Sequence, residues 1–209
     1  TPPRPPGTPT MKRYLVQTFG CQMNVHDSER MEEVLHDHGY EPTDEATLAD
    51  VIVVNTCSIR EKAEHKLLSL LGTYRALKAE RPDLVLAVAG CVAQQEGEAL
   101  LKRVGYIDLV LGPDNIPELP ALLRRVEGGE PPIARTVHDL DEPQFLVARP
   151  DANASKVTAF VTTMKGCDER CSFCIVPTTR GPERYRPSRE ILDEVRALVG
   201  AGAREVVLL

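Results

Sequence analysis

Three closely spaced cysteines are the clearest chemical signal in the sequence. Cys167, Cys171 and Cys174 lie in the stretch GCDERCSFC, with three and then two residues between them. This spacing lets one loop bind a single cubane iron–sulfur cluster through three thiolates, so that the fourth iron stays open to a small molecule. A zinc site needs a fourth donor, and no His or Cys occurs in the 35 residues that follow. The alternative is three unrelated loop cysteines.

Cys21, Cys57 and Cys91 form a second set, although they lie far apart in the chain. Each directly follows a predicted strand, in QTFGC, VVNTC and AVAGC, and each precedes a predicted helix. In a parallel sheet these positions share one carboxyl edge, where ligands bind and helix N-termini favour anions. The pattern predicts a second three-cysteine metal site. The alternative is small apolar residues that close strand ends, because free cysteine is often buried in cores.

Strands and helices alternate from Met11 onward, and this alternation is what positions the cysteines. Apolar runs predict strands at residues 14–19, 51–54, 84–89 and 107–111, with a short additional strand at 39–42. Helical spacing of apolar residues predicts helices at 27–37, 59–78 and 92–104. Such alternation indicates a parallel sheet with helices on both faces. We therefore predict a flavodoxin-like or Rossmann-like α/β domain over residues 11–129.

The remaining segments differ in character. Residues 1–10 hold five of the seventeen prolines and predict a flexible tail, and the proline-containing, weakly periodic stretch 130–153 predicts a linker. Beyond it we expect a strand at 157–163, a helix at 188–198 with Ser188 as N-cap, and a strand at 205–209. Because this β-α-β start cannot close a sheet or barrel, residues 154–209 predict a second domain that is truncated at its C-terminus.

Composition restricts the class of protein. Of 209 residues, 42% are hydrophobic and 27% charged, which is typical of a globular protein. No apolar run approaches the ~20 residues of a membrane span, and the N-terminus lacks a signal-peptide pattern. We expect a cytoplasmic protein, in which thiols stay reduced and bind metals rather than form disulfides. The net charge of −6 argues against a protein that coats nucleic acid.

Charge is unevenly distributed along the chain. Residues 165–189 hold six basic and three acidic side chains, so an anionic substrate should meet this C-terminal part. Arg180, Arg184, Arg186 and Arg189 lie in or next to it, and they either contact phosphates of an RNA or form a solvated loop face.

Several stretches resemble a known family. The triplet, with Phe173 immediately before Cys174, resembles that of the radical S-adenosylmethionine enzymes. FGCQMNVHDSE, NTCSIREKAEHK and GCVAQ resemble the N-terminal domain of the methylthiotransferases, and GCDERCSFCIVPTTRG resembles their radical domain. The resemblance covers residues 11–209, and NTCSIREKAEHK looks most like the tRNA branch. It implies the start of a radical S-adenosylmethionine (β/α) barrel, with residues 157–163 as its first strand.

The resemblance also implies the chemistry. Cys167, Cys171 and Cys174 would hold a radical-generating [4Fe–4S] cluster whose open iron binds S-adenosylmethionine, which is cleaved to a 5′-deoxyadenosyl radical. Cys21, Cys57 and Cys91 would hold an auxiliary [4Fe–4S] cluster for sulfur delivery. The substrate would be N(6)-dimethylallyladenosine beside the anticodon, in the tRNA anticodon stem-loop, methylthiolated at ring carbon 2. A second S-adenosylmethionine would donate the methyl group.

Partners and rival functions follow from the same resemblance. The clusters need an electron donor such as flavodoxin or ferredoxin, and no membrane is involved. The alternatives are a ribosomal-protein aspartate methylthiotransferase of the same family and a non-catalytic iron–sulfur protein. By comparison with that family, we expect the rest of the barrel and an RNA-binding domain to lie outside this sequence, and we expect this polypeptide alone to be inactive. Tyr185 stands where the family commonly has a serine, so we assign no role to it.

Supporting residues have simpler alternative roles. Phe173 and Ile175 either contact the adenine of S-adenosylmethionine through their backbone or pack the loop. Three polar residues after the first cysteine match the family pattern, but helix capping is the expected role of Asn24, Asp27 and Ser28. Two histidines near cluster cysteines, His26 and His65, are expected on the surface. Beyond the cluster ligands, we predict no catalytic residue.

Overall fold

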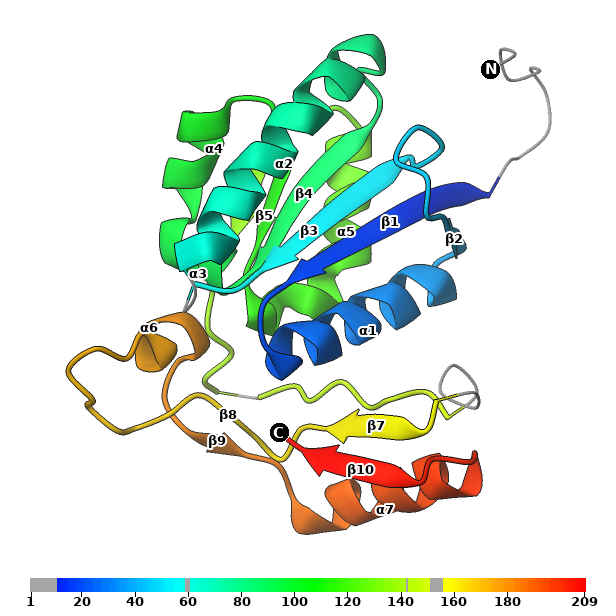
Figure 1. The fold of residues 1–209 in the computed structure, drawn as a ribbon, viewed down its shortest axis with the longest axis vertical. Coiled ribbons are helices and arrows are strands. Elements are labelled where there is room, and N and C mark those ends of the chain that lie inside the picture. The colour runs from blue at the N-terminus through cyan, green and yellow to red at the C-terminus, as the bar shows by residue number, and fades with distance from the viewer. Residues whose placement is uncertain (1–10, 59–60, 142, 151–155) are drawn as a thin grey trace.

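The computed structural model describes residues 11–58, 61–141, 143–150 and 156–209. Figure 1 shows two units: a large sheet flanked by helices, and a smaller unit beneath one end of it that carries the C-terminus. The predicted flexible tail at 1–10 lies outside the described residues. The same holds for the first two positions of the predicted second helix, 59–60, and for 151–155.

The large unit is built on a six-stranded sheet in the order β2-β1-β3-β4-β5-β6, with every neighbouring pair parallel. All residues of β3 and β4 are buried, as expected for central strands that helices cover on both faces. The predicted α/β class is therefore confirmed, and so is the short strand before Val51. The strands are β1 (Lys12–Phe19), β2 (Tyr40–Pro42), β3 (Val51–Thr56), β4 (Val85–Gly90), β5 (Leu109–Leu111) and β6 (Ile133–Arg135).

Helices cover both faces of this sheet. On one face, Leu35 and Leu123 pack with odd-numbered residues of β3 and β4; on the other, Leu71 and Leu100 pack with even-numbered ones. No described helix is both long and apolar enough to cross a bilayer. The elements are α1 (Gln22–Asp37), α2 (Glu61–Glu80), α3 (Cys91–Glu96), α4 (Glu98–Val104), the 3₁₀ helix η1 (Pro113–Glu118) and α5 (Leu119–Glu127).

Two elements differ from the sequence prediction. The helix expected over 92–104 is divided into α3 and α4 by Gly97, whose φ of +49° lies in the left-handed region that favours glycine. The stretch 130–153, predicted as a linker, contributes β6 to the sheet, where Ile133 to Arg135 pair with β5. Part of the predicted linker therefore belongs to the large unit.

The smaller unit contains a parallel β-α-β arrangement, as predicted, although the N-cap of its helix is Pro187 and the expected Ser188 is the first helical residue. β7 (Thr158–Val161) pairs with β10 (Glu205–Leu208), and α7 (Ser188–Gly200) connects them in the chain. A two-residue antiparallel pair, β8 (Met164–Lys165) and β9 (Arg184–Tyr185), was not predicted. It brings together the two ends of the cysteine loop, which also contains the short helix α6 (Val176–Arg180).

A buried ion pair in the smaller unit holds α7 in place. Arg186 donates from Nη1 to Glu194 Oε2, and both side chains are almost fully buried. The other carboxylate oxygen, Oε1, accepts the backbone N–H of Ala148 at 2.6 Å. Because a buried charge without its partner is unfavourable, this contact fixes α7 against the segment that precedes β7.

We predict that Glu194→Ala strongly destabilises the protein, because it removes the buried carboxylate partner of Arg186 and leaves only the longer contact with Glu190, whose carboxylate is exposed, at 3.5 Å. The expected loss in the free energy of unfolding is about 3–5 kcal/mol, measured by urea denaturation. Asp193→Ala is the matched control, since Asp193 is the preceding residue of α7 and its side chain is exposed. Its effect should stay within about 0.5 kcal/mol. Equal losses in the two variants would mean that the buried ion pair contributes nothing beyond an exposed carboxylate of the same helix.

Candidate metal centres and the interface between them

Cys21, Cys57 and Cys91 lie at the carboxyl edge of the sheet. The last residues of three adjacent strands, Phe19, Thr56 and Gly90, are in register. Cys57 and Cys91 come immediately after two of these strand ends, and the Cys57 N–H donates to the Phe19 carbonyl at 3.1 Å. Cys21 precedes α1, and its thiol is hydrogen-bonded with that of Cys57. The topology thus brings together residues separated by more than thirty positions.

Glycines leave room for this arrangement. At Gly20 an added Cβ would lie 2.6 Å from Cys57 Cβ, and at Gly90 it would lie 2.6 Å from the Thr56 carbonyl oxygen. Both glycines also have positive φ, of +147° and +91°. A side chain at either position would displace the backbone beside a cysteine, so the glycines in FGC and AGC have a steric reason.

Hydrogen bonds among polar side chains of α1, β1 and β3 stabilise the sheet edge next to the cysteines. The Asn55 amide donates to Ser28 Oγ at 2.9 Å and to the Asn24 carbonyl at 2.8 Å. Asn24 Oδ1 accepts the Cys21 N–H at 3.4 Å, so Asn24 closes the first turn of α1, as expected for a capping role. Ser28 also contacts Thr18 at 2.6 Å. Ser28 therefore has a buried bridging role rather than the expected capping one, and no pattern in the sequence singled out Asn55.

The donor set at this edge consists of three cysteine thiols, which are the usual ligands of an iron–sulfur cluster. Among the described residues, no group of three or more His, Cys, Asp or Glu side chains converges to hold one metal ion. A cubane spreads three thiolates over three irons, so its ligands need not converge on one point. Two buried hydroxyl oxygens on either side of Cys57 in the sequence, Thr56 Oγ1 and Ser58 Oγ, also have no hydrogen-bond partner among the residues that the structure describes. These two hydroxyl groups can donate hydrogen bonds to the sulfur atoms of a cluster.

The Cys21 thiol is unusually acidic. The hydrogen bond with Cys57 lowers its pKa to about 5, although partial burial opposes this shift. The backbone at Asn24 and Met23 and the positive charge of Arg180 act in the same direction. A thiolate is the form that binds metal, so this edge favours the ligating state of Cys21 at neutral pH.

The second set lies in the exposed loop between β8 and β9. The Cys167 N–H donates to the Gly181 carbonyl at 3.0 Å, and the Cys174 N–H donates to the Cys171 carbonyl at 3.1 Å. Cys171 and Cys174 are exposed, and Phe173 is 93% exposed. Of the two roles suggested for Phe173, packing of the loop is therefore wrong in this structure. Ile175 directly precedes α6 and is half-buried.

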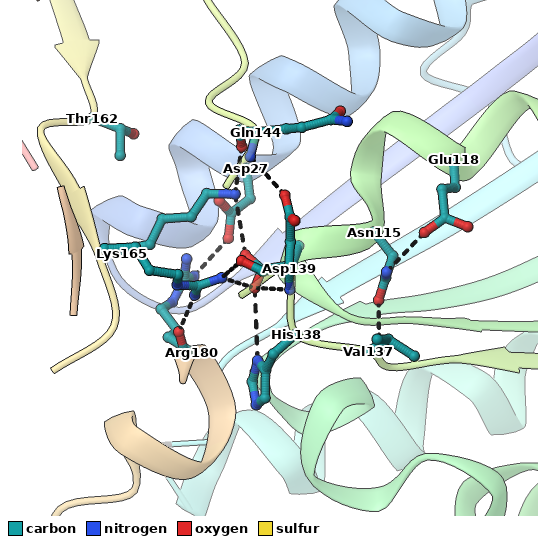
Figure 2. A network of polar contacts seen from close by, with 12 residues as sticks. Asp27, Asn115, Glu118, Val137, His138, Asp139, Gln144, Thr162, Lys165 and Arg180 are labelled. Carbon is teal, nitrogen blue, oxygen red and sulfur yellow. Dashed lines mark hydrogen bonds and ion pairs between the residues drawn. The ribbon is translucent and has the colours of Figure 1, made fainter. Parts of the chain in front are cut away.

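Buried ion pairs fix both ends of this loop onto the large unit (Figure 2). Asp114, at the start of η1, accepts from Lys165 Nζ at 3.1 Å and from Arg184 Nη1 at 2.5 Å. Asp27, in α1, accepts from Arg180 Nη2 at 2.6 Å. Burial alone would raise the pKa of both carboxyls, but the neighbouring cations lower it, so both acids are ionised at neutral pH.

These contacts correct three sequence expectations. Arg180, Arg184 and Arg186 are neither solvated nor available to RNA phosphates, because their guanidinium groups are buried in ion pairs within the protein. Arg189 alone of the four is exposed.

Polar residues of α1 also differ from expectation. His26 is 5% exposed rather than on the surface, and its Nε2 lies 3.1 Å from Thr162 Oγ1 of the smaller unit. Asp27 pairs with Arg180 rather than capping the helix. His65 is exposed, as expected. Asp114 was missed, although its position just after β5 at the cysteine edge was a usable signal.

Comparison with known proteins adds independent information. Residues 13–112 match the Uncharacterized protein family UPF0004, and residues 161–209 match the Radical SAM superfamily. The chain is 64% identical over 205 residues to a tRNA-2-methylthio-N(6)-dimethylallyladenosine synthase of Sorangium cellulosum, covering 95% of this chain and 41% of that protein. It is 53% identical over 200 residues to the synthase of Myxococcus xanthus, covering 95% and 43%. The chain thus spans less than half the length of these curated relatives.

A solved structure shares the fold. The radical S-adenosylmethionine methyltransferase TsrM from Kitasatospora setae aligns with a TM-score of 0.51 at 13% identity. The alignment covers 94% of this chain and 47% of that one. At this identity the likeness extends to the arrangement of elements and not to the chemistry.

We predict that Cys21 in the metal-free protein reacts with iodoacetamide as a thiolate down to about pH 5, the pKa given by its surroundings. Mass spectrometry of alkylated peptides across a pH series measures the midpoint. Cys57→Ala should move that midpoint upward, because it removes the hydrogen bond that contributes most. A midpoint near the ordinary thiol value of 9.0 in the unsubstituted protein would contradict the prediction.

The free energy of unfolding should depend on the ionisation of the Cys21 thiol. Because folding lowers the pKa of Cys21, its stabilising contribution is fully present above about pH 9, declines as the pH falls, and is lost below about pH 5. The difference in the free energy of unfolding between the wild type and Cys21→Ser should therefore shrink from pH 9 to pH 5. A difference that grew on acidification would have the wrong sign.

Proposed function

The chain belongs to the radical S-adenosylmethionine methylthiotransferase family, and on this premise we propose that the protein is a tRNA methylthiotransferase. Its substrate would be N(6)-dimethylallyladenosine beside the anticodon, modified at ring carbon 2. The observation that carries this proposal is the 64% identity to a synthase named for this product, over a segment that includes both cysteine sets. Electron carriers typically use four cysteines per cluster, whereas each set here has three.

The six cysteines would hold the two cofactors. Cys167, Cys171 and Cys174 would bind a [4Fe–4S] cluster and, through its open iron, S-adenosylmethionine. Their exposure supports this assignment, because a small molecule can reach two of the three thiols. Cys21, Cys57 and Cys91 would bind the auxiliary cluster. When bound, these groups would supply radical hydrogen abstraction at the first site and sulfur at the second.

The substrate explains the need for such cofactors. The hydrogen on ring carbon 2 of an adenine is not acidic, and the carbon carries no leaving group. General-base or nucleophilic catalysis by side chains therefore has nothing to act on. The residues of this chain would instead hold the two cofactor sites in a fixed relation. Asp27 and Asp114 support that role, because they bind both ends of the triplet loop to the edge that carries the other three cysteines.

The proposed chemistry implies an electron donor, a cellular location and an RNA partner. An external reductant such as flavodoxin or ferredoxin would supply electrons, and a tRNA substrate implies a cytoplasmic enzyme. Binding of the anticodon stem-loop would rest largely on residues other than Arg180, Arg184 and Arg186, because these three side chains are engaged within the protein.

We predict that the full-length protein, reconstituted anaerobically, holds about eight irons per chain, as expected for two cubanes. Replacement of Cys167, Cys171 and Cys174 by Ala should lower this to about four, and so should replacement of Cys21, Cys57 and Cys91. Iron and sulfide analysis measures both. About four irons in the wild type and none in the first variant would eliminate the auxiliary site.

We predict that a host lacking the full-length gene loses 2-methylthio-N(6)-dimethylallyladenosine from its tRNA. The wild-type gene should restore the modification, whereas a Cys91→Ala version should not. Mass spectrometry of digested tRNA nucleosides measures the product. Normal levels of the modification in the deletion strain, together with loss of methylthio-aspartate from a ribosomal protein, would assign the enzyme to the other branch of the family.

A further inference from the structure

Arg180 connects the triplet loop to the edge that carries the other cysteines. It is the last residue of α6, which begins two residues after Cys174. Its side chain is 11% exposed and donates to Asp27 Oδ2 at 2.6 Å. The same positive charge interacts electrostatically with the thiols of Cys91, at the start of α3, and of Cys21, at the start of α1. One side chain of the smaller unit thus pairs with α1 and places a positive charge beside candidate cluster ligands of the large unit.

The packing of the helices supports this contact. α6 packs directly against α3, the helix that Cys91 opens. The Arg184 guanidinium donates to the Arg180 carbonyl at 2.5 Å, so the end of α6 is itself held in place. Asp27 is almost fully buried and ionised, and its carboxylate directs the planar guanidinium of Arg180.

Arg180 differs from the neighbouring buried cations. Lys165 and Arg184 both reach Asp114, and Arg186 reaches Glu194, so each of these is paired with a carboxylate. Arg180 also pairs with a carboxylate, and its positive charge interacts in addition with the thiols of Cys21 and Cys91. A cation at this position would stabilise added negative charge on a cluster bound there, because Coulomb interactions are strong where water is excluded.

We propose that Arg180 is a positioning residue that acts on the auxiliary cluster from the radical domain. It holds the triplet loop against the sheet edge through Asp27, and its positive charge raises the reduction potential of the cluster that Cys21, Cys57 and Cys91 bind. Hydrogen bonds to ligand sulfur and nearby charge are established determinants of such potentials. This inference rests on the proposed function only in that it requires an iron–sulfur cluster at the edge.

The test isolates the auxiliary cluster. In full-length protein with Cys167, Cys171 and Cys174 replaced by Ala, iron can bind only at the sheet edge. The midpoint potential of that cluster is measured by an anaerobic redox titration followed by electron paramagnetic resonance. Arg180→Gln in this background should shift the potential to a more negative value, because it removes the positive charge beside the cluster.

Two further variants provide comparison values for the expected shift in reduction potential. Arg180→Lys keeps the positive charge but lacks the planar guanidinium that pairs with Asp27, so its shift should be smaller. It also serves as the test if Arg180→Gln binds no iron. Arg189→Gln removes an exposed arginine of α7 and should leave the potential unchanged.

The outcomes are distinguishable. A purely structural role would lower the melting temperature of Arg180→Gln without moving the potential of the loaded cluster. An unchanged potential in Arg180→Gln, or in Arg180→Lys if only that variant is loaded, overturns the inference and leaves the proposed function intact. Absence of iron from the parental background overturns the auxiliary site of the proposed function, and this inference with it.

Discussion

The ionisation of two buried carboxylates determines how the two units of this protein fit together. Asp27 and Asp114 lie on different elements of the large unit, and three cations on or beside the triplet loop reach them: Lys165, Arg180 and Arg184. None of these charges is favourable in the interior alone, so each requires its partner from the other unit. The loop that carries three cysteines is consequently held against the sheet edge that carries the other three.

The features predicted correctly from sequence are those set by local pattern and topology. Apolar runs marked the central strands, and parallel order then placed Cys21, Cys57 and Cys91 at one edge. β6 was missed because three residues, Ile133 to Arg135, directly after two prolines carry almost no periodic signal. The exposure of His26 and the three buried arginines was predicted wrongly, because their partners lie far away in the chain and composition cannot identify them.

The distribution of charge has a different meaning in the folded protein. Residues 1–148 carry an excess of acidic side chains, and residues 149–209 a small excess of basic ones. From sequence, the second group suggested attraction of an anionic substrate. In the structure much of it neutralises the first group across the interface, through Lys156 with Glu29, Arg149 with Asp37 and Arg180 with Asp27. The asymmetry thus reflects assembly of the protein as much as binding.

Helix α1 packs against both the sheet and the smaller unit, which limits how segments can be exchanged between related proteins. One side of this helix packs Met31 and Leu35 on the sheet, while His26 and Asp27 face the smaller unit. A chimera that joined the first half of this chain to the second half of a distant homologue would pair α1 with an unmatched surface. Such halves are interchangeable only if the second half supplies cations that match Asp27 and Asp114, so the two units have to be exchanged together.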